Sequence, residues 1–74
     1  MSGAKTQIGK TRIGTIAAPY GREVWLSEVD FESGMRLLRV TIREGTRYTI
    51  LDLDAETASL WAGLMSNWAA QDKG

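Results

Sequence analysis

The 74-residue sequence predicts an α+β fold, a four-stranded antiparallel β-meander followed by one C-terminal helix packed on one sheet face (ββββα). Three observations predict it. Runs of alternating apolar and polar residues follow one another along the chain. Short hinges containing glycine separate these runs. The last third of the sequence changes to helical spacing. We expect a single domain over residues 11–70, with a flexible tail at 1–10 and a frayed end at 71–74.

The first two strands are expected at residues 12–18 and 23–31. The first is the weaker, because Gly14 interrupts its apolar positions Ile13 and Ile16. Pro19-Tyr20-Gly21 is typical of a turn, since proline presets φ and glycine tolerates a positive φ. The second run alternates regularly, as expected for a strand with two different faces.

Two hinges set the predicted register of the remaining strands. Glu32-Ser33-Gly34 and Arg43-Glu44-Gly45 both fit a three-residue hairpin loop that ends in glycine. In that register Val29 opposes Leu37, and Val40 opposes Tyr48. The two hinges then agree on one apolar face, which we expect to be the core. Its members are Val24, Leu26, Leu38, Val40, Ile42, Tyr48 and Ile50.

The helix is predicted to begin after Asp54, whose carboxylate can cap the free N–H groups of the first turn. Glu56 suits the positive end of the helix dipole. Large apolar residues then recur at helical spacing and form one stripe. They are Leu60, Trp61, Leu64, Met65 and Trp68. We expect this stripe to cover the core face of the sheet.

The opposite sheet face would then remain uncovered. It is expected to carry Trp25, Val29, Phe31, Met35, Leu37 and Leu51 toward one end, and Arg39, Thr41, Arg43, Arg47 and Thr49 toward the other. A monomer rarely exposes so large an apolar patch. The sequence therefore predicts an interaction surface on this face.

Three interpretations of that surface stay open. In a homodimer, symmetry-related apolar residues would pack together; the candidates are Val29, Met35, Leu37, Leu51 and, from the helix, Trp68. In a platform for single-stranded nucleic acid, aromatic rings would stack on bases while basic groups meet phosphates; the candidates are Trp25, Phe31, Arg39, Thr41, Arg43 and Arg47. Alternatively, the sheet face or an edge strand would bind another protein.

Composition excludes several kinds of chemistry. The chain has no cysteine and no histidine, which removes thiolate chemistry, histidine-based acid–base catalysis and the usual zinc sites. No glycine-rich phosphate loop precedes the helix. We therefore expect a noncatalytic protein without cofactor or metal. No apolar run reaches membrane-spanning length and no signal segment is evident, so we expect a cytoplasmic protein without a membrane contact.

Charge is balanced overall but unevenly distributed. The formal net charge is zero, with nine basic and nine acidic side chains, which disfavours strong nonspecific binding to polyanions. Residues 1–51 carry a balance of +3, and residues 52–74 carry −3. Such asymmetry can orient a partner or a second copy of the chain.

The junction Leu51-Asp52-Leu53-Asp54-Ala55-Glu56, together with the strand order over residues 12–70, resembles the positive-cofactor-four type of transcriptional coactivator. That resemblance implies a dimer that binds single-stranded DNA through a curved sheet. The chain is also similar to short uncharacterised bacterial proteins.

Overall fold

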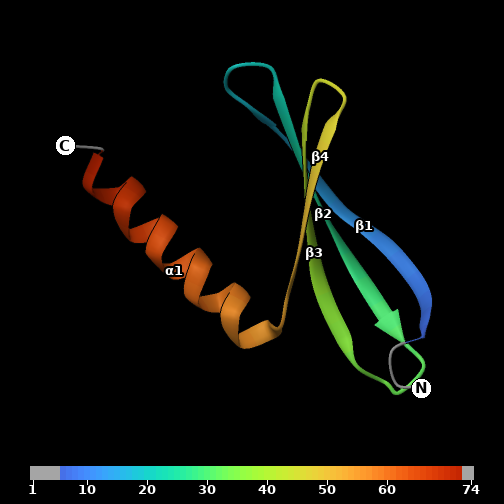
Figure 1. The fold of residues 1–74 in the computed structure, drawn as a ribbon. Coiled ribbons are helices and arrows are strands. Elements are labelled where there is room, and N and C mark those ends of the chain that lie inside the picture. The colour runs from blue at the N-terminus through green and yellow to red at the C-terminus, as the bar shows by residue number, and fades with distance from the viewer. Residues whose placement is uncertain (1–5, 73–74) are drawn as a thin grey trace.

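The computed structural model describes residues 6–72 and confirms the predicted fold class. Strands β1 (Gln7–Ala18), β2 (Arg22–Phe31), β3 (Arg36–Glu44) and β4 (Arg47–Leu53) form one antiparallel sheet in the order β1-β2-β3-β4. The C-terminal helix α1 (Ala55–Asp72) follows (Figure 1).

Strand β1 is longer than the sequence predicts, because it begins at Gln7 rather than at residue 12. Residues 7–10, expected in a flexible tail, therefore belong to the sheet. Register shifts between Gln7 and Gly9 and between Arg12 and Gly14 interrupt the pairing with β2. The predicted weakness at Gly14 is thus a bulge within a longer strand. Residues 1–5 of the expected tail and 73–74 of the expected frayed end lie outside the described residues.

The first predicted hairpin is confirmed. The Phe31 N–H donates to the Met35 carbonyl at 2.9 Å, and the Gly34 N–H donates to the Phe31 carbonyl at 2.9 Å. Gly34 has a φ of 94°, a backbone conformation that favours glycine. Val29 opposes Leu37, as the sequence predicts.

The second predicted hairpin is wrong by three residues. Gly45 and Thr46 form a two-residue loop, and Gly45 has a φ of 63° at the first loop position, as a type II′ turn requires. Val40 consequently opposes Leu51 instead of Tyr48. Because side chains alternate along a strand, this odd shift moves every β4 side chain to the other face. Tyr48 and Ile50 therefore leave the expected core face.

The corrected register defines two faces of the sheet. One, here called the helix-side face, carries the ion pairs of Arg22 with Glu44 and of Arg36 with Glu28. Its apolar residues are Ile16, Val24, Leu26, Leu38, Val40, Ile42, Leu51 and Leu53. The other, here called the far face, contains Trp25, Ser27, Val29, Leu37, Arg39, Thr41, Arg43, Tyr48 and Ile50. Strand β4 therefore contributes Leu51 and Leu53 to the helix-side face and Tyr48 and Ile50 to the far face.

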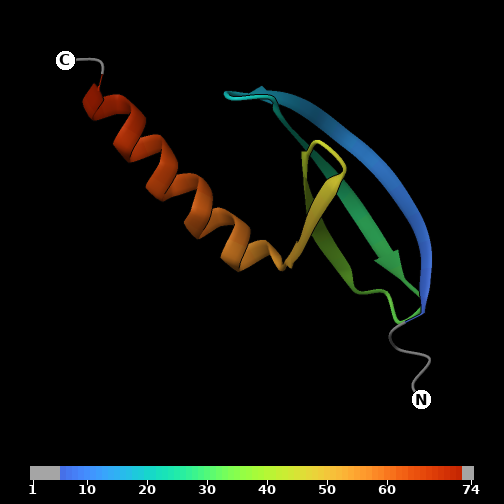
Figure 2. The same ribbon diagram turned by 45° about the horizontal axis from the view of Figure 1, so that its top comes forward.

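Helix α1 does not lie on the sheet. It leaves the end of β4 and diverges from the strands, so that helix and sheet form the two arms of a V (Figures 1 and 2). Leu64 and Trp68 are 70% and 68% exposed. The expectation that the helix packs on a sheet face is therefore not met. Asp54 alone connects strand and helix, whereas connections between strands and helices usually contain two to six residues.

The single chain has very little core. Among the described residues, the buried apolar side chains are Val29 and Val40. The radius of gyration is 14.7 Å, against about 11 Å for a compact chain of this length. The accessible surface is 5661 Å², against roughly 4,500 Å² for a compact protein of this mass. Much of the apolar surface of a single chain is therefore exposed to solvent.

The turn before β2 offers a test of this backbone description. Tyr20 has a φ of 64°, a conformation that asparagine and glycine adopt more easily than tyrosine. We expect Tyr20→Asn to raise the free energy of unfolding by about 0.5–1 kcal/mol in urea denaturation. Thr46→Asn is the matched control, because this loop residue has a negative φ. An equal gain at both positions, or none at Tyr20, would contradict the assignment.

Candidate interaction surface

Both arms of the V carry exposed apolar side chains. On α1 the large side chains form the stripe predicted from the sequence, here called the α1 stripe. Their exposed fractions are 62% for Leu60, 37% for Trp61, 70% for Leu64, 62% for Met65 and 68% for Trp68. On the sheet arm, Ile13, Ile16 and Leu51 are 58%, 54% and 38% exposed. Trp61 is the least exposed member of the stripe.

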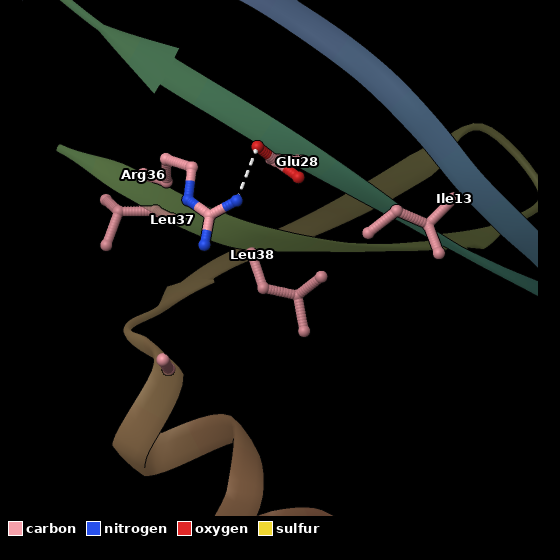
Figure 3. Close-up of a pocket in the computed structure, with 6 residues that line it drawn as sticks. Ile13, Glu28, Arg36, Leu37 and Leu38 are labelled. Atoms are coloured by element: carbon pink, nitrogen blue, oxygen red, sulfur yellow. Dashed lines mark hydrogen bonds and ion pairs between the residues drawn. The ribbon is translucent and has the colours of Figure 1, made fainter. Parts of the chain in front are cut away.

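A hollow of about 150 Å³ lies at the corner where β4 passes into α1. Figure 3 shows Ile13 and Leu38 pointing into the space above the first turn of the helix, where Ala55 lies. Arg36 donates to Glu28 at 3.3 Å on the rim of this hollow. An apolar hollow with one ion pair at its edge suits an apolar side chain better than a polar ligand.

The far face, in contrast, is covered by its own long side chains. The Arg12 guanidinium lies 5.1 Å from the centroid of the Trp25 ring. The Tyr48 ring meets the same indole edge-on, with centroids 6.2 Å apart. Thr41, which opposes Trp25 on β3, and the neighbouring Ser27 are only 6% and 2% exposed. The face expected to be free is therefore the better covered of the two.

Ion pairs complete this cover. Arg39 donates twice to Asp52, at 2.8 and 3.0 Å, and Arg43 donates to Glu23 at 3.0 Å. The hydrogen bond from Arg39 lowers the pKa of Asp52, and the same bond raises the pKa of Arg39. On the other side of the sheet, two further arginines pair with carboxylates, Arg22 with Glu44 and Arg36 with Glu28. Most of the arginine charge of the sheet is thus balanced locally.

The structure separates the predicted nucleic-acid candidates. Trp25, Phe31, Arg39, Thr41 and Arg43 share the far face, as expected. Arg47 pairs with Glu44 in the sheet register, which places it on the side opposite Arg43. The odd shift in the second hairpin is the cause. Within residues 6–72 Arg47 makes no ion pair.

The predicted dimer candidates are also dispersed. Val29 is fully buried, so it has no surface to offer a partner. Leu37 is half-buried beside it on the far face. Met35 lies in the loop before β3, and Leu51 belongs to the helix-side face. Only Trp68 lies in the α1 stripe. Sequence reasoning missed Ile13 and Ile16 as interface candidates, although both were recognised as apolar positions of the first strand.

Within the described part of the chain, no helix is long and apolar enough to span a bilayer. The same residues contain no group of three or more carboxylates that could hold a metal ion.

These features define a class of protein: a small α+β domain with an antiparallel meander and a C-terminal helix that its own sheet leaves uncovered. The chain belongs to a family of unknown function, DUF6967, whose model matches residues 7–71. No curated protein and no solved structure matches it.

The pair between Arg39 and Asp52 gives a pH-dependent prediction. The folded-state pKa of Asp52 is lowered from 3.8. The pair therefore stabilises the fold above that value, and the stabilisation is lost as pH falls through the lower folded pKa. We expect Asp52→Asn to lower the free energy of unfolding by up to about 1 kcal/mol at neutral pH and to flatten its decline in acid.

Urea denaturation from neutral pH to about pH 2 measures both effects. Glu32→Gln is the control, because this loop carboxylate makes no ion pair within the described residues. If Asp52→Asn and the control show the same acid profile, the pair contributes nothing to stability.

Proposed function

We propose that this protein is a small noncatalytic interaction domain whose working form is a homodimer. The helix-side face and the α1 stripe together are the contact surface. The observation that carries the proposal is the exposure of the stripe: every one of its large side chains is at least 37% exposed in the single chain. Monomeric proteins rarely leave a contiguous apolar surface of this kind in water.

The area involved supports a dimer. One chain exposes roughly 1,100 Å² more than a compact protein of its mass. A stable interface of standard size buries about 800 Å² on each partner. Burying one large apolar side chain contributes about 1.5–3 kcal/mol. The uncovered surface is therefore large enough, and apolar enough, to offset the cost of association.

The distribution of charge on the helix-side face supports the same conclusion. Arg22 and Glu44 pair at the end near the β1–β2 turn, and Arg36 and Glu28 pair at the end near α1. The residues between these pairs are mostly apolar. An apolar centre with a polar rim is the usual anatomy of a protein–protein interface.

Single-stranded nucleic acid, the other ligand predicted from the sequence and from the coactivator resemblance, is less well supported. A phosphate on the far face would compete with Asp52 for Arg39 and with Glu23 for Arg43. A base stacking on Trp25 would have to displace Arg12 from the indole ring. These contacts favour the homodimer over the nucleic-acid platform.

The oligomeric state tests the proposal. Sedimentation velocity at micromolar concentration should give twice the chain mass of 8.2 kDa. We expect Leu64→Lys to shift the protein to monomer, because lysine matches leucine in helix propensity but resists burial. Ile50→Lys is the matched control, since Ile50 is 57% exposed on the far face, and this variant should stay dimeric. A monomeric wild-type protein with ordered helix would refute the proposal.

Nucleic-acid binding has its own test. Titration of the tryptophan fluorescence with a single-stranded oligonucleotide at low salt should give no saturable change, because Arg39 and Arg43 of the far face are already paired with Asp52 and Glu23. Binding that weakens with salt and is lost in Arg43→Ala would instead establish the platform function.

A further inference from the structure

We infer that α1 of a second copy fills the V between the helix-side face and α1, and that the exchange is reciprocal. This inference rests on the proposed homodimer and adds its arrangement. Helix and sheet diverge where β4 ends (Figures 1 and 2), and the large side chains of the α1 stripe are 37–70% exposed.

The chain's own helix is poorly placed to close the V. Asp54 is the single residue between Leu53 of the sheet and Ala55 of the helix. One extended residue spans at most about 3.6 Å, whereas a helix with its side chains is about 10–12 Å across. The Asp54 carboxylate also accepts the Thr57 N–H at 2.8 Å, which fixes the first turn. Folding the helix back onto the sheet would require a sharp change of chain direction at Leu53 or Asp54.

A second α1 has the right dimensions. Its 18 residues extend about 27 Å at 1.5 Å per residue. The nine residues of β3 extend about 30 Å along the middle of the sheet. Under two-fold symmetry each copy gives one helix and receives one, so both apolar arms of both copies become covered at once.

The composition of α1 fits a position between two layers. From residue 57 to residue 71 the helix contains no charged side chain. The side opposite the α1 stripe carries small residues, Ser59, Ala62, Ser66 and Ala70. A helix lying on the outside of a sheet would normally present charged residues to water on that side. A helix inserted between a sheet and another helix needs no such polar face.

Site-specific cross-linking tests this arrangement, and the absence of natural cysteine makes every introduced thiol unique. One chain carries Leu51→Cys on the helix-side face, and a second chain, enlarged by a tag, carries Ser66→Cys on α1. The two are refolded together and treated with a short bismaleimide. We expect a mixed product between the differently sized chains.

Ile50→Cys is the matched control for Leu51→Cys. Ile50 is the neighbouring residue on β4 and lies on the far face. Its substitution removes an apolar side chain similar to that of Leu51. We expect at least a tenfold lower yield of the mixed product with this variant. Equal yields from both positions would overturn the arrangement.

A single chain carrying both Leu51→Cys and Ser66→Cys separates the remaining outcomes. Linked dimers support exchange. An internally linked monomer means that the chain's own helix folds over its sheet, and products joined only through Leu51→Cys mean that the sheets stack; either result overturns the inference. The wild-type mass reports separately on the homodimer, so a dimer with the wrong cross-links defeats this inference alone.

Discussion

The direction of α1 is set at Asp54, and the rest of the structure depends on it. The Asp54 carboxylate accepts the Thr57 N–H, and its carbonyl accepts the Ala58 N–H at 2.9 Å. The hydrogen bond to Thr57 lowers the pKa of the Asp54 carboxyl, so the cap is charged at neutral pH. With the helix capped one residue after β4 ends, its axis continues away from the sheet. Both the helix-side face and the α1 stripe are consequently left without a partner in their own chain.

The two sheet faces are stabilised in different ways. On the far face, Arg12, Trp25 and Tyr48 form one continuous layer over small strand residues, and the adjacent pairs of Arg39 and Arg43 satisfy their charges locally. Beyond this layer, Tyr48 and Ile50 remain 56% and 57% exposed. The helix-side face buries Val40 but leaves its neighbours half-exposed. Folding of the chain and covering of this face should therefore be linked, because a partner that binds the folded state stabilises it.

The sequence was sufficient for the fold class, for the first hairpin and for the cap at Asp54, since each rests on local chemistry. It was insufficient for the second hairpin. Strand β4 is apolar on both sides, with Tyr48 and Ile50 on one and Leu51 and Leu53 on the other, so hydrophobic alternation fits either register. The turn decided the register, because Gly45 occupies the first position of a two-residue loop.

The position of α1 was not predictable from its apolar stripe. A stripe shows which side of a helix is to be buried, but it does not show whether the burying surface belongs to the same chain or to another. The informative signal lay in the rest of the helix, which lacks charge from residue 57 to residue 71. A helix that covers its own sheet keeps one side in water, and such a side is normally rich in lysine and glutamate. In the proposed dimer both sides of α1 are enclosed and the two far faces point outward. The indole and arginine layer of the far face would then be the outer surface of the assembly, and its balanced ion pairs suit it to contact with water.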